Sequence, residues 1–147
     1  MSFQKFDSPL PLVIVDTSVF ISALLSKNPN SAPCKIIIYW REGRFNLVIS
    51  PQLLEELVEK LLAKNIDKTD IKDILTAIFY TAIKIQGTYQ ATILDNIDPN
   101  DNMFLAAAYE VSADYLVSLD KKHILPLKHY HGTQILSPDL FIRILDK

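Results

Sequence analysis

The stretch LPLVIVDTSVF, from Leu10 to Phe20, decides the fold. Every residue from Leu12 to Val15 is apolar, which predicts a strand at the centre of a parallel sheet that is covered on both faces. This strand ends in Asp16, and a carboxylate is costly to bury without a partner. Asp16 is therefore expected to cap a helix, to form an ion pair or to bind a metal ion.

Periodic apolar residues and helix-start signals place the other elements. Thr17 or Ser18 is predicted to cap the first helix, which frees Asp16 for a metal ion. Ser-Pro pairs at Ser50 and Ser137 predict two helix starts. The expected helices cover residues 17–25, 34–42, the segment from 51, 66–83, 101–111 and 137–145, and the expected strands cover 12–15, 45–50, 115–120 and 133–136. Residues 83–96 are ambiguous between a loop and a short strand. The alternation predicts an α/β fold with a mainly parallel sheet.

Composition narrows the class of protein. The 147 residues are 49% hydrophobic, which suits one domain, expected over residues 10–147 after a loose leader at 1–9. A single cysteine, Cys34, excludes an intrachain disulfide and a cysteine-rich zinc site, and it fits a cytoplasmic location. No uncharged stretch approaches the length of a membrane span. The net charge of −2 argues against a strongly basic nucleic-acid binder but leaves room for a local basic patch.

The acidic residues gather at one edge of the predicted sheet. Asp16 and Asp120 stand at the ends of the strands predicted over residues 12–15 and 115–120. Glu55 and Glu56 lie in the helix that follows the strand over 45–50, and Asp98 and Asp101 lie at the start of the helix that leads into the strand over 115–120. Ligands of open α/β sheets bind at this carboxyl edge. Two carboxylates 4 Å apart repel by about 4 kcal/mol at an effective dielectric constant of 20, so a cation is expected among them. An oxygen-only ligand set, without a nearby histidine or cysteine, favours Mg²⁺ or Mn²⁺ over zinc.

Four segments together resemble the PIN domain family. They are VIVDTSVFISALL from Val13, ISPQLLEELVEKL from Ile49, DPNDNMFLAAAYEVSADYLVSLDKKHIL from Asp98 and ILSPDLF from Ile135. The chain is most similar to the VapC-like toxins of bacterial and archaeal toxin–antitoxin systems. The resemblance implies a three-layer α/β/α sandwich and a metal-dependent endoribonuclease. It further implies an RNA substrate, an antitoxin partner and a homodimer or higher oligomer.

The resemblance also assigns site residues. The family's four acidic positions fall on Asp16, Glu56, Asp101 and Asp120, which are expected to bind the ion and act in catalysis, although helical periodicity alone does not choose between Glu55 and Glu56. The residues expected to hold these ligands in place are Thr17, Ser18, Asp98 and Ser118, and those expected to meet substrate phosphates are Lys121, Lys122 and Arg44. Lys122 stands where relatives often carry another acidic residue.

Simpler interpretations stay open at this stage. Asp101 fits a helix cap, Asp120 fits the start of a turn, and His123 fits a packed or solvent-facing side chain near the site. A haloacid-dehalogenase-type phosphatase would need an aspartate where Ser18 stands, and a receiver domain would need an acidic pair at the end of its first strand. A catalytically inactive RNA-binding domain, acting through partners, is the remaining alternative.

Overall fold

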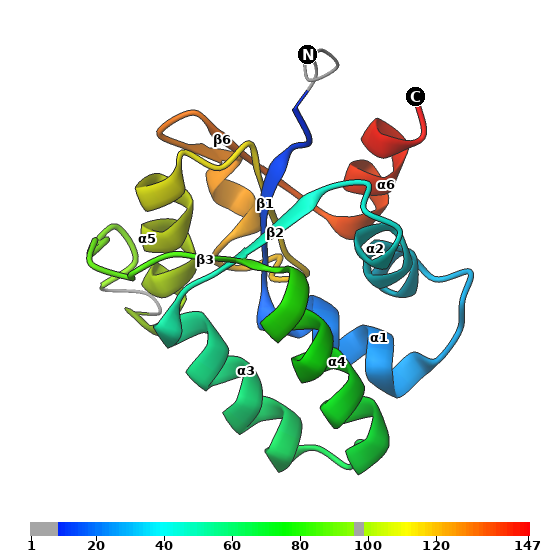
Figure 1. Ribbon diagram of the computed structural model, residues 1–147. Helices are drawn as coiled ribbons and strands as arrows, with labels where there is room; N and C mark the ends of the chain where they lie inside the picture. The colour runs from blue at the N-terminus through cyan, green and yellow to red at the C-terminus, as the bar shows by residue number, and fades with distance from the viewer. Residues whose placement is uncertain (1–8, 96–98) are drawn as a thin grey trace, which may run out of the picture.

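The computed structural model describes residues 9–95 and 99–147, which form a six-stranded sheet flanked by helices (Figure 1). The strand order is β3-β2-β1-β4-β6-β5, and every neighbouring pair is parallel except β5–β6. The strands are β1 (Leu12–Val15), β2 (Asn46–Ile49), β3 (Ile83–Lys84), β4 (Tyr115–Val117), β5 (His129–Tyr130) and β6 (Thr133–Leu136). The α/β fold with a mainly parallel sheet is therefore confirmed, while nearly all of the predicted leader lies outside the described residues.

Helices cover both faces of this sheet, as a three-layer sandwich requires. Helix α5 (Asn102–Val111) lies on one face, and α1 (Thr17–Ser26), α2 (Ala32–Arg41) and α6 (Pro138–Leu145) lie on the other (Figure 1). The remaining pair, α3 (Pro51–Ala63) and α4 (Lys68–Thr81), extends beyond the sheet on the side where β1 ends. Within the described residues, no helix is both long enough and apolar enough to span a membrane.

Serine caps begin three of the helices. The hydroxyls of Ser50 and Ser137 accept the backbone N–H groups of residues three positions on, at 3.2 and 3.4 Å, and proline follows each cap. Both predicted Ser-Pro starts are thus confirmed. The hydroxyl of Ser31 also accepts the backbone N–H of the residue three positions on, Cys34, at 3.3 Å. Helix α2 therefore begins at Ala32, in the segment between the predicted helices 17–25 and 34–42. Pro33 fits there because a proline at the start of a helix loses no internal hydrogen bond.

The predicted strand over residues 115–120 is too long, and the short strand β5 was not predicted. β4 ends at Val117 because residues 118–123 turn back through hydrogen bonds to Ser118 and Asp120. β5 pairs with β6 through a two-residue turn in which His131 and Gly132 have φ angles of 49° and 89°. Two positive φ angles are typical of the tight hairpin turns that match the twist of a sheet, and glycine supplies one of them without strain.

Three aromatic rings attach α6 to the sheet. The fully buried Phe141 packs edge-on against Phe45, with ring centroids 5.3 Å apart, and lies 5.4 Å from the ring of Tyr115 in β4. Because Phe45 precedes β2, the C-terminal helix covers two strands that are far apart in the sequence. The last helix is therefore part of the same core as the first strand.

Replacing Phe141 by alanine should lower the free energy of unfolding by about 3–5 kcal/mol, because a large buried ring leaves a cavity. For a chain of this length, that loss corresponds to a Tm lower by roughly 10 °C in calorimetry. Leu140→Ala is the matched control, since Leu140 is 46% exposed on the same helix. A Tm shift of equal size in both variants would contradict the packing of α6 on the sheet.

Candidate metal centre

One pocket brings together the four acidic residues that the sequence singles out. Asp16 follows β1, Glu56 lies on α3, Asp101 ends a short 3-10 turn (Pro99–Asp101) before α5, and Asp120 lies beyond β4. Their common pocket has a volume of about 520 Å³, and its other lining residues are Thr17, Ser18, Ile21, Ser22, Lys60, Lys64 and Asn100. The expectation that these carboxylates share one edge of the sheet agrees with this arrangement.

Asp16 is the buried anchor of the pocket, with only 6% of its surface exposed. Its Oδ2 accepts hydrogen bonds from the hydroxyls of Ser118, at 2.6 Å, and Ser18, at 3.1 Å. Its Oδ1 accepts the backbone N–H of Ser18 at 3.3 Å, so Asp16 itself caps α1. The prediction that Thr17 or Ser18 provides this cap was wrong, because the helix already begins at Thr17 and Asp16 has the extended backbone conformation of a cap residue.

Burial raises the pKa of Asp16 above its ordinary value of 3.8, because the charged form loses hydration. The hydrogen bonds from Ser118 and Ser18 act in the opposite direction, and the nearby charge of Glu56 raises the pKa further. The net result is a buried carboxyl group that is harder to ionise than one in water. A cation in the pocket would favour its charged form.

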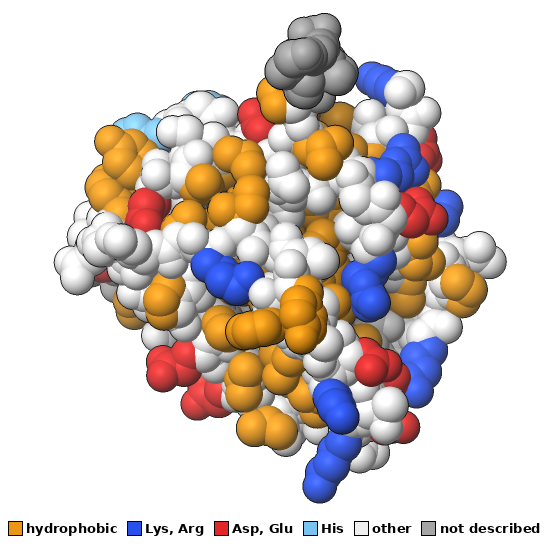
Figure 2. All heavy atoms as spheres, in the orientation of Figure 1, with side chains coloured by type: hydrophobic (Ala, Val, Ile, Leu, Met, Phe, Trp, Pro, Cys, Tyr) orange, Lys and Arg blue, Asp and Glu red, His pale blue; other side chains and the backbone are white. Residues whose placement is uncertain are grey.

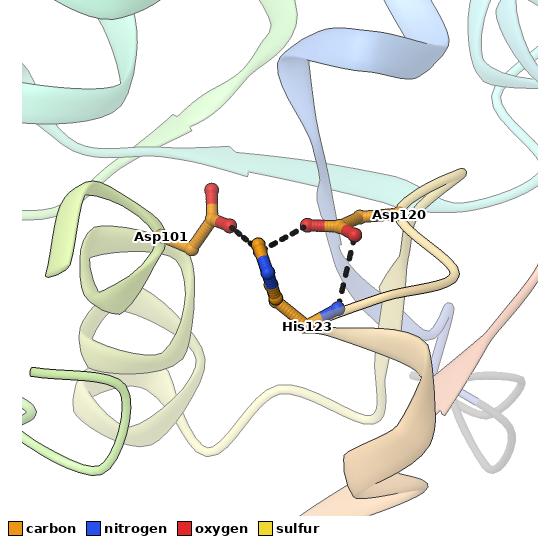
Figure 3. A group of neighbouring side chains, drawn as sticks. All are labelled: Asp101, Asp120 and His123. Atoms are coloured by element: carbon orange, nitrogen blue, oxygen red, sulfur yellow. Dashed lines mark hydrogen bonds and ion pairs between the residues drawn. The ribbon is translucent and has the colours of Figure 1, made fainter. Parts of the chain in front are cut away.

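Asp120 occupies the turn that follows β4. Its backbone N–H donates to Ser118 Oγ at 2.9 Å, and its Oδ1 accepts the backbone N–H groups of Lys122 and His123, both at 3.0 Å. Burial acts to raise the pKa of Asp120, but these backbone donors, a hydrogen bond with Asp101 and the charge of His123 outweigh it and hold the pKa below 3.8. The turn interpretation of Asp120 is therefore correct, yet its second carboxylate oxygen still faces the site (Figure 3).

His123 lies between Asp101 and Asp120, as Figure 3 shows. Its Nδ1 is 3.9 Å from Asp101 Oδ2 and 3.7 Å from Asp120 Oδ2. One ligand atom from each of the three residues lies within 4.8 Å of the other two, so the group could hold a metal ion. The premise of an oxygen-only site without a nearby histidine was therefore wrong. Asp101 stands at the helix-cap position of α5 but makes no side-chain cap hydrogen bond, so that simpler interpretation fails.

Helix α3 presents a charged face to the pocket. Glu56, Lys60 and Lys64 are spaced by four residues and all line it, whereas Glu55 is exposed and lies outside it. Of these two glutamates, only Glu56 lines the pocket. The two lysines were missed in the sequence, although Lys60, four positions from Glu56, necessarily shares its face of the helix, and Lys64 follows directly after the end of α3.

None of the three expected phosphate contacts lines the pocket. Arg44 precedes β2 and is therefore at the opposite edge of the sheet, where it donates to the carbonyl of Leu145 at 2.7 Å and lies 4.0 Å above the ring of Tyr39. It attaches the end of α6 and does not reach the pocket. Lys122 is exposed and is not among the lining residues, and the same holds for Lys121. Asp98 lies outside the described residues.

A sequence model of the PIN domain matches residues 12–122, which include all four acidic residues of the pocket. The chain belongs to the PIN domain family. An uncharacterized protein of Methanocaldococcus jannaschii, MJ1680, is 31% identical over 156 aligned positions, which cover 98% of this chain and 97% of the relative. Membership of the PIN domain family removes the phosphatase and receiver-domain alternatives.

A solved structure supports the fold of this PIN domain. The VapBC2 complex from Rickettsia felis, bound to a DNA fragment from its promoter, contains a chain that aligns with a TM-score of 0.59 at 15% identity. The alignment covers 86% of this chain and 98% of the other. At this identity the likeness establishes the fold alone.

The donor set of the pocket fits a divalent cation. One carboxylate oxygen of Asp101 lies within 4.8 Å of one of Asp120, so their two negative charges would repel each other. Asp16 resists ionisation because burial removes the hydration of its charged form. A cation among the three would stabilise all three charges, which is the usual reason for clustered carboxylates in a protein.

The raised pKa of Asp16 predicts a specific pH dependence. The protonated form of Asp16 contributes to the free energy of unfolding below pH 3.8. This contribution is lost as the pH rises through the higher pKa that Asp16 has in the folded protein. In EDTA, the Tm of Asp16→Asn should therefore increase relative to the Tm of the wild type as the pH rises from about 4 to 7. Melting curves across this range measure the difference, with the exposed Asp139→Asn as control. A Tm of Asp16→Asn that falls relative to that of the wild type as the pH rises would contradict the assignment.

Proposed function

We propose that this PIN domain is a metal-dependent endoribonuclease that hydrolyses RNA phosphodiester bonds, and that it is the toxin of a toxin–antitoxin pair. The observation that carries the proposal is the single pocket into which Asp16, Glu56, Asp101 and Asp120 converge from four separate elements. A cytoplasmic location follows from an RNA substrate. Membership of the PIN family supports nuclease chemistry, and the shared fold with a VapBC complex supports the toxin assignment.

Asp16, Asp101 and Asp120 would hold a Mg²⁺ or Mn²⁺ ion, and Glu56 would orient its water ligands. When bound, such an ion lowers the pKa of a water molecule towards neutrality and stabilises negative charge on the phosphate. Ser118 and Ser18 hold the carboxylate of Asp16 in one orientation through their hydroxyl groups. Ser118 is fully buried, so its hydroxyl orients Asp16 and does not reach a substrate.

Lys60 and Lys64 supply the positive charge that the substrate needs. Lys60 lines the pocket on the same face of α3 as Glu56, and Lys64 lines it just beyond the end of that helix, so phosphate oxygens near the carboxylates would also meet two ammonium groups. These lysines explain how a protein with a net charge of −2 could bind RNA locally. Lys122 does not line the pocket, so its positive charge does not compete there with a bound cation. This placement favours an active enzyme over an inactive RNA-binding domain.

Purified protein should cleave single-stranded RNA with Mg²⁺ or Mn²⁺, and EDTA should abolish the cleavage. Glu56→Gln should lower kcat at least tenfold, because it removes a charge from the pocket while keeping its shape. Glu55→Gln is the matched control on the adjacent, exposed position and should retain wild-type activity. Gel assays on a mixture of defined RNAs measure both variants.

Cleavage that persists in EDTA would contradict the metal-dependent mechanism. Equal losses in the Glu55 and Glu56 variants would remove Glu56 from the reaction and point to a general effect of charge. A protein that binds RNA tightly but cleaves none of the substrates with either ion would favour the inactive alternative.

An apolar groove on α3 and α4 would receive the antitoxin. It is lined by Leu54, Val58, Leu62, Leu75 and Phe79, with Lys68, Lys72 and Lys84 at its margins. Phe79 is 68% exposed, and Leu54 is also exposed. Figure 2 shows hydrophobic side chains gathered over these helices between blue lysines. An amphipathic segment with an apolar ridge and acidic residues fits this surface. Self-association of the protein stays a prediction.

Phe79→Ser should weaken binding of the antitoxin by roughly 30-fold or more, because exposed aromatic residues in apolar grooves often dominate binding energy. The partner to test is a small protein encoded beside this one, co-expressed and measured by calorimetry. Leu25→Ser provides the control, since Leu25 is 51% exposed on α1 and lies outside the groove. Equal affinities for both variants would place the antitoxin elsewhere.

A further inference from the structure

We propose that His123 is itself a metal ligand, and that its imidazole makes the site select a transition metal ion such as Mn²⁺ over Mg²⁺. The inference rests on the proposed metal-dependent function and concerns the identity of the ion. It extends the ligand set beyond the four acidic residues of the family pattern. The group that carries it consists of Asp101, Asp120 and His123.

The distances favour a shared ion over a direct contact. Nδ1 of His123 is 3.7 Å from Asp120 Oδ2 and 3.9 Å from Asp101 Oδ2. Hydrogen bonds of this type are shorter, at about 2.7–3.2 Å. Two adjacent ligands of one octahedral ion with bonds of about 2.1 Å lie about 3.0 Å apart. The observed separations are less than about 1 Å longer than this, so a small inward movement of the side chains would bring them to adjacent positions around one ion.

The backbone fixes His123 beside the carboxylates. Its N–H donates to Asp120 Oδ1 at 3.0 Å, and the N–H of Leu125 donates to the carbonyl of Asp120 at 2.9 Å. The next residue, Ile124, is fully buried in the core. The turn is therefore anchored on both sides of His123, and the imidazole side chain remains 30% exposed beside Asp101 and Asp120. A ligand that is already oriented loses little freedom when the ion binds.

The chemistry of the imidazole determines which ion benefits. Mg²⁺ prefers oxygen ligands and a nearly ideal octahedron, so a nitrogen donor adds little to its binding. First-row transition ions accept imidazole readily, and carboxylates remain suitable for Mn²⁺. Two carboxylate oxygens and one imidazole nitrogen thus shift the preference of the site away from Mg²⁺. Mn²⁺ is the probe of choice because it is paramagnetic.

Electron spin echo spectroscopy of the Mn²⁺-loaded full-length protein tests the ligand directly. The wild type should show the nitrogen coupling of a bound imidazole, and His123→Asn should lose it. The same variant should bind Mn²⁺ at least tenfold more weakly in titrations followed by electron paramagnetic resonance. Its affinity for Mg²⁺, measured by competition, should change less than threefold. His123→Gln repeats the test with a longer amide, and His131→Asn, on the distant β5–β6 turn, should behave as the wild type.

Two further outcomes separate this inference from the proposed function. Asp101→Asn should lose Mn²⁺ binding, and undiminished binding in that variant would contradict the metal site as a whole. If Asp101→Asn loses binding while His123→Asn retains both the nitrogen coupling and the affinity, only the role of His123 is wrong. Tighter Mn²⁺ binding in His123→Asn would also overturn it, since His123 would then act as a cation that competes with the metal.

Discussion

The hydrogen bond from Ser118 to the buried carboxylate of Asp16 is the interaction on which the rest of the structure depends. It is 2.6 Å long and joins residues 102 positions apart at the ends of the two central strands. The parallel pairing of Val15 with Val117 brings the two side chains together. The same carboxylate also caps α1, so the start of that helix, the ends of both strands and the floor of the pocket share one charged group.

The pocket places two aspartates in opposite environments. Burial makes Asp16 reluctant to ionise, whereas backbone N–H donors favour the charged form of Asp120 despite its partial burial. Carboxylate oxygens of Asp101 and Asp120 also lie within 4.8 Å of each other. Without a cation, the site therefore has unfavourable electrostatics both at the buried Asp16 and between Asp101 and Asp120. The surrounding strands can tolerate this because their own hydrogen bonds and apolar packing do not involve the carboxylates.

Local signals in the sequence were sufficient for the parts of the fold that depend on short-range chemistry. The Ser50 and Ser137 caps and the apolar run of β1 each act within a few residues, and each was predicted correctly. The cap of α1 was misassigned because Asp16, Thr17 and Ser18 all have suitable side chains, and only the tertiary position of Ser118 distinguishes them. His123 was underestimated because its direction depends on a turn whose hydrogen bonds go to Asp120. Arg44 was misplaced although the strand predicted over residues 45–50 already puts it at the amino end of that strand, which is the opposite edge of the sheet.

Helix α3 links the two surfaces of the proposed function because it has three distinct sides. Residues 53, 57 and 61 are buried, residues 56, 60 and 64 line the acidic pocket, and residues 54, 58 and 62 line the apolar groove. Positions two apart on a helix are separated by about 200°, so the groove and the pocket lie on nearly opposite sides of it. A partner confined to the groove would leave the pocket open. Inhibition would therefore require a partner that reaches around α3 to Lys60 and Lys64, or one that moves the helix and with it Glu56.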